Sequence, residues 1–152
     1  YNLNNEFNVP FGRYKSPYFP EDELHAFSEK AKKARFICQD FESAMKQARK
    51  NSVIYCDPPY VALSKTASFT NYSGNSFSLS DQERLVRISE ELSLSGVPVL
   101  ISNHDTPYTK NLYNNAECHY LNVRRSISSK VTDRNKVIEV LAMYHNNIIN
   151  KR

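Results

Sequence analysis

The chain has 152 residues, 40% of them hydrophobic, and this composition predicts a folded globular domain. Its net charge of +4 is a mild basic excess, which fits a nucleic-acid partner without requiring one. Cys38, Cys56 and Cys118 are widely spaced and form no Cys-x-x-Cys pair, and no apolar run reaches the ~18 residues of a membrane span. Because no leader opens the chain either, we expect a cytoplasmic protein with reduced cysteines, no metal site and no membrane contact.

Residues 1–20 differ in composition from the rest of the chain. They contain three prolines, four asparagines and six aromatic residues, and they show neither helical nor strand periodicity. Flexible linkers lack aromatic side chains, so we interpret this segment as an ordered loop region. Regular elements begin only after it, which divides the chain into residues 1–20 and 21–152.

Helix and strand patterns alternate in the first half of the regular region. Residues 20–34, PEDELHAFSEKAKKA, carry acids at the start and lysines at the end, as the dipole of a helix favours. A short strand is predicted at 35–40, RFICQD, a helix at 41–50, and a second strand at 52–57, SVIYCD.

The second half begins with a capping signal. Ser80 and Glu83 have the spacing of a capping box and predict the start of a helix, which Gly96 ends. A third strand is predicted at 97–103, VPVLISN, and a short helix at 106–114.

The strand patterns predict an α/β sheet. Residues 53–56 and 97–101 are continuous apolar runs, as in strands that are buried on both faces of a parallel sheet. Their alternation with helices predicts a doubly wound α/β fold. The last two strand-like runs, 118–128 and 136–145, have a polar loop and no helix between them, so we expect an antiparallel pair at the end of the sheet.

The second strand runs directly into Asp-Pro-Pro-Tyr. In open α/β sheets ligands bind beyond the carboxyl ends of the strands, where this pattern places Asp57. Pro58 and Pro59 fix two φ angles and remove two backbone donors, so the rim offers only acceptors, the Asp57 carboxylate and the Pro58 carbonyl. Tyr60 adds a flat ring beside them.

Such a rim suits a planar group that carries an amino group. One hydrogen can go to the carboxylate and the other to the carbonyl, which directs the nitrogen lone pair toward an electrophile. Transfer of a group to the exocyclic amino nitrogen of a base requires this arrangement, and the base must be flipped out of its duplex. The plain alternative is an Asp-Pro-Pro turn with Tyr60 as a core aromatic.

Asp-Pro-Pro-Tyr after a hydrophobic strand resembles the catalytic motif of amino-methyltransferases that use S-adenosylmethionine. The segments EFNVPFGRYKSPYFP (6–20), VPVLISNHDT (97–106) and VRRSIS (123–128) extend this resemblance to the Dam-like DNA adenine methyltransferases, which read GATC. The resemblance covers nearly the whole chain. It implies the C-terminal part of a Rossmann-like S-adenosylmethionine-dependent methyltransferase sheet, with an antiparallel terminal hairpin, preceded by part of a DNA-recognition region.

The resemblance also implies roles for single residues of the motif. Asp57 would bind the target adenine amine and lie against the methionine part of the cofactor. Pro58 would lend its carbonyl, Pro59 completes the rigid motif, and Tyr60 would stack on the flipped adenine.

Residues 1–20 are similar to the end of the target-recognition region of that family. Pro10 would then touch the thymine methyl group of double-stranded DNA. Arg13, Tyr14 and Lys15 would engage the DNA backbone or flanking bases, and a basic pair around an aromatic residue suits phosphate contact and stacking. An ordinary solvated loop is the alternative for these three residues.

Further positions leave two interpretations open. The segment 124–136 has five basic residues and one acid, so Arg124 and Arg125 belong either to a loop along DNA phosphates or to a plain solvated loop. Asp40, at the end of the predicted strand 35–40, either meets the adenine ring of the cofactor or caps the next helix.

The segment after the third strand, SNHDTP, faces the same edge of the sheet as Asp57. Asn103, His104 and Asp105 resemble a catalytic cluster, but we interpret no serine or cysteine as a nucleophile that would act with His104 and Asp105. We interpret them as pocket wall and helix start, with Asp105 or Thr106 as the cap.

One family feature is missing from the sequence. The family has a Gly-rich F-x-G-x-G loop for the cofactor, and none of Gly12, Gly74 and Gly96 forms one. We therefore expect the chain to be the C-terminal part of an enzyme whose N-terminal part holds the first strands of the sheet. Half a sheet exposes an edge and apolar faces, so we expect the chain to associate.

Three functions remain. The first is adenine-N6 methylation of DNA, in a bacterial or phage-infected cell, for repair, restriction protection or phage biology. The second is a non-catalytic DNA-binding remnant or split-enzyme fragment without the cofactor loop. The third is methylation of another amine, such as cytosine N4 or a protein glutamine, although related enzymes of that kind tend to carry Ser or Asn in place of Asp57.

Overall fold

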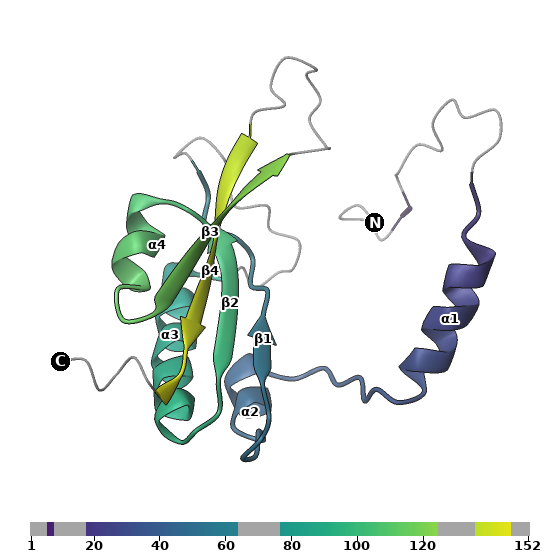
Figure 1. Ribbon diagram of the computed structural model, residues 1–152, viewed down its shortest axis with the longest axis horizontal. Helices are drawn as coiled ribbons and strands as arrows, with labels where there is room; N and C mark the ends of the chain where they lie inside the picture. The colour runs from purple at the N-terminus through teal and green to yellow at the C-terminus, as the bar shows by residue number, and fades with distance from the viewer. Residues whose placement is uncertain (1–5, 8–17, 64–76, 125–135, 147–152) are drawn as a thin grey trace. The chain divides into compact units, whose positions relative to one another are not determined.

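The computed structural model describes residues 6–7, 18–63, 77–124 and 136–146. The chain divides into two compact units, residues 1–38 and 39–152. The first unit contains helix α1, and the second contains every strand and the other described helices (Figure 1). The functional boundary after residue 20 stays a prediction.

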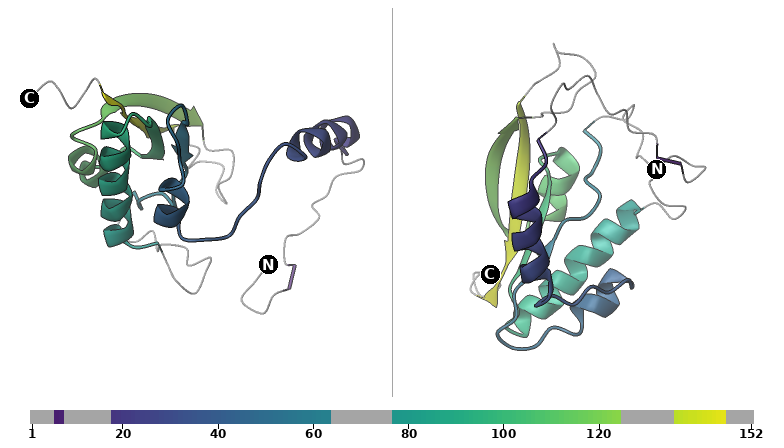
Figure 2. Two further views of the ribbon diagram at one scale, coloured as in Figure 1. Left: turned by 90° about the horizontal axis from the view of Figure 1, so that it is seen from below. Right: turned by 90° about the vertical axis from the view of Figure 1, so that its right-hand side faces the viewer.

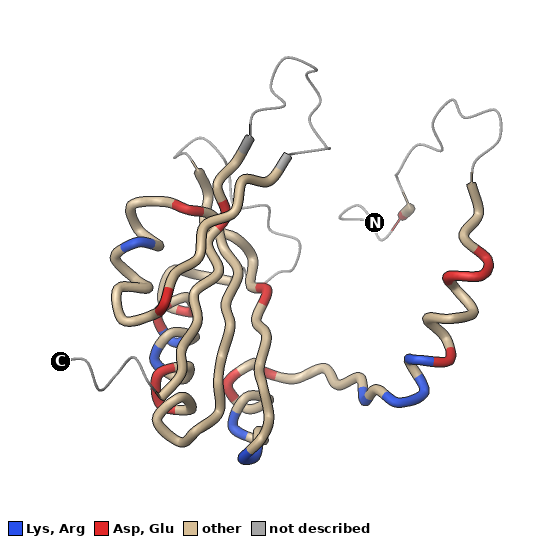
Figure 3. The backbone as a smooth tube through the Cα atoms, viewed as in Figure 1, with Lys and Arg blue, Asp and Glu red and all other residues tan. Residues whose placement is uncertain are grey.

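Helix α1 (Glu21–Ala31) has the charge pattern that its sequence predicts. Glu21, Asp22 and Glu23 occupy the first turn and Lys30 the last, as the charge colouring of Figure 3 shows. Negative charge near the N-terminus and positive charge near the C-terminus both stabilise the helix dipole. None of the residues of α1 is buried within its unit.

The strand predicted at residues 35–40 is wrong. The structure assigns no strand to these residues, because a strand needs a neighbour that completes its ladder of hydrogen bonds. Asp40 is the N-cap of helix α2 (Phe41–Met45) instead, and its side chain accepts hydrogen bonds from the backbone N–H groups of Glu42 and Ser43. The helix predicted at 41–50 is therefore present but shorter.

The second unit is built on a mixed sheet of four strands in the order β1-β2-β4-β3. Strand β1 pairs with β2 in parallel, and β4 pairs antiparallel with both β2 and β3. The α/β class and the antiparallel pair at the end of the sheet are thus confirmed. The strands are β1 (Ile54–Cys56), β2 (Val99–His104), β3 (Glu117–Arg124) and β4 (Lys136–Tyr144).

Three helices cover one face of this sheet: α2, α3 (Leu79–Leu94) and α4 (Pro107–Leu112) (Figure 2). No described helix of the second unit covers the opposite face, and no described helix is long and apolar enough to cross a membrane. The core lies between the helices and the sheet, where alternate strand residues point toward the helices. It contains Met45, Leu85, Val86, Ile88, Val99, Ile101, Tyr113, Val140, Ala142 and Tyr144.

Helix α3 begins two residues earlier than its sequence predicts. Ser78, not Ser80, is the N-cap, and it forms a capping box with Asp81. The backbone of Ser78 is extended, so its side chain can accept from the N–H group of Asp81, whereas Ser80 already lies inside the first turn. Gly96 follows the helix at a φ of 83°, a left-handed conformation that glycine adopts without strain.

Candidate active site

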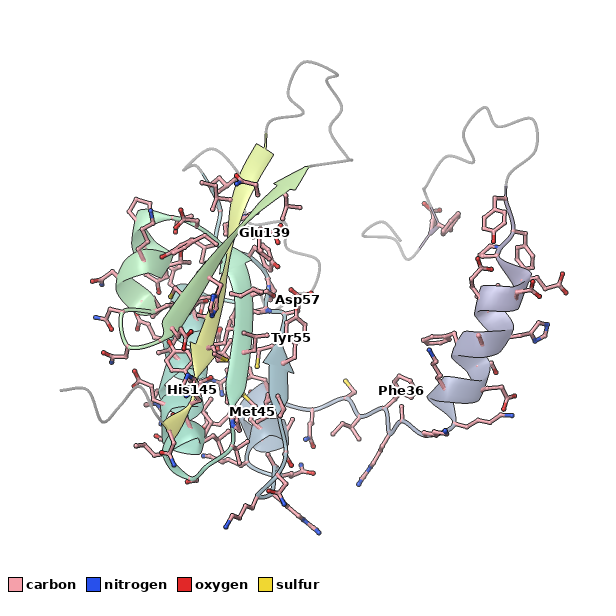
Figure 4. The ribbon with its side chains drawn as sticks, viewed as in Figure 1. Phe36, Met45, Tyr55, Asp57, Glu139 and His145 are labelled. Atoms are coloured by element: carbon pink, nitrogen blue, oxygen red, sulfur yellow. The ribbon has the colours of Figure 1, made fainter. Side chains whose placement is uncertain are left out.

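Strand β1 delivers Asp57 to the carboxyl edge of the parallel pair. Cys56 lies opposite Ile101 in the register of β1 and β2, so Asp57 and Ser102 follow at the same level. The Ser102 hydroxyl lies 2.7 Å from Oδ1 of Asp57 and donates to it. Figure 4 shows Asp57 beyond the end of β1, next to Tyr55.

The backbone that follows Asp57 is held from two sides. The side-chain amide of Gln82, on α3, donates to the carbonyl of Pro59 at 2.8 Å. On β2, Oδ1 of Asn103 accepts from the N–H group of Val61, also at 2.8 Å. These bonds fix both ends of the Pro59–Val61 segment and leave Tyr60 between them.

Asn103 is fully buried, and its amide is satisfied on every side. Its oxygen accepts from the backbone N–H groups of Val61 and His104, and its nitrogen donates to Oε1 of Gln82 and to the hydroxyl of Tyr113. When a buried amide makes all of its hydrogen bonds, it fixes the positions of its partner groups, because each buried partner would be costly to leave without a hydrogen bond.

Tyr60 is half-buried against the ring of His104. The two ring centroids lie 4.9 Å apart at an interplanar angle of 84°, the edge-to-face geometry that aromatic rings favour. Nδ1 of His104 lies 2.8 Å from the carbonyl of Val61, so this nitrogen carries the proton and the ring orientation is set. Burial raises the pKa of Tyr60, with the Ser102 hydroxyl acting in the opposite direction, so the phenol stays neutral at physiological pH.

Acceptors remain at the rim for a ligand. No described residue donates to Oδ2 of Asp57 or to the carbonyl of Pro58. Asp57 itself is exposed, whereas Pro58 is buried and anchors the turn. The arrangement can therefore accept hydrogen bonds from a planar donor placed beside Tyr60.

Asp40 has partners on both carboxylate oxygens. Oδ1 caps α2, and Oδ2 lies 2.9 Å from Nη2 of Arg84. The hydrogen bond with Arg84 is the main cause that lowers the pKa of Asp40. The capping interpretation is confirmed, and contact with a cofactor ring stays a prediction.

The remaining candidates fall largely outside the described residues. Pro10, Arg13, Tyr14, Lys15 and Arg125 lie there, as does the side chain of Arg124, whose backbone ends β3 opposite Lys136. Their DNA contacts stay predictions.

Metal-ligating groups and cysteines are two further features that bear on the chemistry of the described residues. No group of three His, Cys, Asp or Glu side chains is placed there to hold a metal ion. All three cysteines are unpaired, and burial raises the pKa of Cys56, which adjoins the site, to about 11. Its thiol is therefore protonated and a poor nucleophile at neutral pH.

The sequence analysis identified part of this site and missed the rest. Asn103 and His104 contact the motif, and Thr106 is the N-cap of α4, as expected, while their role as the wall of a pocket stays a prediction. Ser102 and Gln82 were not singled out. The parallel register of the two predicted strands could have indicated Ser102, but no local pattern marks a helix glutamine that reaches a loop carbonyl 23 residues earlier.

Known proteins resemble this chain along most of its length. The family model for D12 class N6 adenine-specific DNA methyltransferases matches residues 1–127. The "DNA adenine methylase" of Salmonella typhi is 57% identical over 144 residues, which are 95% of this chain and 52% of that protein. The protein of the same name from Escherichia coli K12 is 54% identical over 149 residues, 98% of this chain and 54% of the relative.

A third relative, the "DNA adenine methylase" of Serratia marcescens, is 52% identical over 145 residues, 95% of this chain and 54% of its own length. The chain thus spans about half the length of the curated relatives that it matches. The mixed α/β sheet carries Asp-Pro-Pro-Tyr at the carboxyl end of its parallel strand pair, and the family model matches most of the residues, so the chain belongs to the D12 class N6 adenine-specific DNA methyltransferase family.

Proposed function

We propose that this chain is the catalytic C-terminal part of a DNA methyltransferase that transfers a methyl group from S-adenosylmethionine to N6 of adenine in GATC. The observation that carries the proposal is the rim at the end of β1. There Asp57 has one oxygen held by Ser102 and the other without a described donor, next to Tyr60. The name shared by the relatives, "DNA adenine methylase", supports the same activity.

The rim would act on the amino group of a flipped adenine. Asp57 would accept one N6 hydrogen and the Pro58 carbonyl the other, while Tyr60 stacks on the purine. Both hydrogen bonds pull the amino group out of conjugation with the ring, so that its lone pair can form the new bond to carbon. As the nitrogen–carbon bond forms, the bond from that carbon to the sulfonium sulfur would break and leave a neutral thioether. The nitrogen would then give up one proton, for which the Asp57 carboxylate of the rim is an acceptor.

S-adenosylmethionine, when bound, supplies an electrophilic methyl group. The exposed carboxylate of Asp57 fits an ammonium or amino partner, in keeping with the predicted contact to the methionine part of the cofactor. Asp40 fits the adenine part less readily, because an incoming donor would compete with Arg84 and the N-terminus of α2. The Rossmann-like arrangement and the Gly-rich loop that completes such a site would come from the N-terminal part of the enzyme.

Binding of double-stranded DNA would rest on residues 1–20, as part of a recognition region, and on the hairpin loop that begins at Arg124. Pro10, Arg13, Tyr14 and Lys15 would contact the target and its flanks, and Arg124 and Arg125 the phosphates. An enzyme with this substrate acts in the cytoplasm.

The test is a fusion enzyme in which this chain replaces the matching segment of the Escherichia coli relative. It is incubated with S-adenosylmethionine and either a GATC duplex or a duplex of equal composition with the site rearranged to GTAC. The DNA is then digested to nucleosides, and the methylated product is identified by mass spectrometry. The N-terminal half of the relative alone is the control.

The proposal predicts N6-methyladenine in the GATC duplex alone, and none with the control. Methylation of cytosine, or of both duplexes equally, would contradict the assigned substrate. DNA binding without any methylation would contradict the catalytic assignment and favour a DNA-binding remnant.

A further inference from the structure

Ser102 joins Asp57 to Tyr55 by hydrogen bonds. Its side chain is almost completely buried, at 2% exposure, on β2 beside the end of β1. Its Oγ lies 2.7 Å from Oδ1 of Asp57, 3.3 Å from the carbonyl oxygen of Cys56 and 3.1 Å from the hydroxyl of Tyr55. Tyr55 is the residue two positions before Asp57, so both side chains lie on the same face of β1 and its extension (Figure 4).

The protons of these groups can be placed in order. Tyr55 donates its hydroxyl hydrogen to Oγ of Ser102, because the serine has a free lone pair there. Ser102 then has a single hydrogen to donate, and two acceptors compete for it. The carboxylate of Asp57 is negatively charged and lies 0.6 Å closer than the carbonyl of Cys56 (3.3 Å against 2.7 Å), so it receives the hydrogen. Hydrogen bonds in such a chain strengthen one another.

The chain of donors limits the freedom of the carboxylate. Asp57 is exposed, and an exposed aspartate would otherwise rotate about its side-chain bonds. With Oδ1 held by Ser102, the plane of the carboxylate is fixed and Oδ2 is left as the acceptor for a ligand. A reacting group held in one orientation contributes to the rate, because less freedom is lost on reaching the transition state.

We propose that Ser102, itself oriented by Tyr55, is a positioning residue that holds the Asp57 carboxylate in its reactive orientation. This inference rests on the proposed function, in which Asp57 binds the target amine. It concerns the step of methyl transfer and not the binding of DNA. Loss of either hydroxyl should therefore change the rate of methyl transfer more than the affinity for DNA.

The geometry distinguishes positioning from a purely structural role. Tyr55 is 61% exposed, and when its hydroxyl is lost Ser102 still donates to Asp57, so no buried donor is left unpaired. Loss of that hydroxyl therefore leaves the core of the unit unchanged. Its hydrogen bond sets the orientation of the Ser102 hydroxyl, and through it acts on Asp57.

The test uses the fusion enzyme and a double-mutant cycle. Ser102→Ala, Tyr55→Phe and the double variant are compared with the unsubstituted fusion enzyme by single-turnover methylation of the GATC duplex. The KM for DNA and the melting temperature are measured for each. Ser89→Ala is the matched serine control, since its buried hydroxyl donates only to the carbonyl of Leu85, at 2.7 Å. Tyr120→Phe is the tyrosine control.

Ser102→Ala is expected to slow methyl transfer about 10- to 100-fold, the range for loss of a hydrogen bond to a charged group, with little change in the KM for DNA. Tyr55→Phe is expected to slow it about threefold to tenfold at an unchanged melting temperature. The double variant should be no slower than Ser102→Ala, because Tyr55 acts through Ser102. Both control variants should keep the full rate.

A full rate of methyl transfer in Ser102→Ala would overturn the inference. So would a double variant that is slower than Ser102→Ala by the same factor by which Tyr55→Phe is slower than the unsubstituted enzyme. The Asp57→Ala variant separates this failure from that of the proposed function. If Asp57→Ala is inactive while Ser102→Ala is fully active, only the positioning role is wrong. If Asp57→Ala methylates normally, the role proposed for Asp57 is wrong as well.

Discussion

The side-chain oxygen of Asn103 accepts a hydrogen bond from the backbone N–H group of Val61 at a distance of 2.8 Å, across 42 residues of sequence. The same side chain donates to Gln82, which in turn holds the carbonyl of Pro59. Asn103 and Gln82 thus form a buried clamp on the backbone of the Asp-Pro-Pro-Tyr motif. Strand β2 and helix α3, not the motif itself, decide where Tyr60 lies.

Asn103→Ala is predicted to destabilise the fusion enzyme by about 3 kcal/mol, because the partners of the lost amide remain buried without hydrogen bonds. Chemical denaturation monitored by circular dichroism measures the change. Asn111→Ala is the control, since Asn111 is an exposed residue of α4. Equal stability of the two variants would mean that the clamp is not formed.

The start of α3 provides a second prediction. Ser78→Ala should destabilise the protein by about 1 kcal/mol, the usual cost of losing an N-cap side chain, whereas Ser80→Ala should have a much smaller effect. Thermal melting of both variants measures the difference. A larger loss of stability in Ser80→Ala than in Ser78→Ala would place the cap at Ser80, as the Ser80–Glu83 spacing suggests.

Two buried tyrosines make a matched pair. The hydroxyl of Tyr113 accepts from Asn103 at 3.0 Å, whereas the buried hydroxyl of Tyr144 has no partner among the described residues. An unpaired buried hydroxyl is unfavourable, so Tyr144→Phe should leave the melting temperature unchanged or raise it. Tyr113→Phe should lower the melting temperature, because it reduces the free energy of unfolding by about 1 kcal/mol. A loss in Tyr144→Phe as large as that in Tyr113→Phe would contradict the pairing described here.

The edge of the sheet leads to a prediction about association. Strand β1 lies at the end of the strand order, and Val53 and Tyr55 beside its free edge are 76% and 61% exposed. The chain alone should therefore self-associate, and Val53→Lys should reduce this, because a charge on an edge strand opposes pairing. Light scattering after size exclusion is the measurement. A cooperatively melting monomer of the unsubstituted chain would count against the prediction, as would equal association of the Val53→Lys variant.

The sequence predicted the elements that depend on local patterns. The acids at the start of α1 and the apolar runs of β1 and β2 were sufficient to predict these elements, and two strand-like runs late in the sequence were sufficient to predict the antiparallel pair of β3 and β4. The strand at 35–40 failed because strand formation depends on a partner and not on composition alone. The start of α3 was misplaced because Ser78 and Ser80 both fit a cap, and only the backbone conformation of Ser78 decides between them.

The site was predictable where the chain order itself brings residues to the sheet edge. Asp57 and the wall residues Asn103 and His104 each follow or end a strand, so the edge rule places them together. Ser102 and Gln82 act through contacts across elements. Their roles depend on the register of β1 with β2 and on the rotation of α3, which no local pattern encodes.

The most direct measurement of the central claim is single-turnover methylation of the GATC duplex by the fusion enzyme with Asp57→Ala, alongside its affinity for the same DNA. The account predicts a loss of methyl transfer of about 1,000-fold or more, because the amino group loses its charged acceptor. DNA affinity should stay within about threefold, since phosphate contacts dominate binding and lie elsewhere. Methylation near the rate of the unsubstituted enzyme would contradict the role of Asp57 and with it the account of the site.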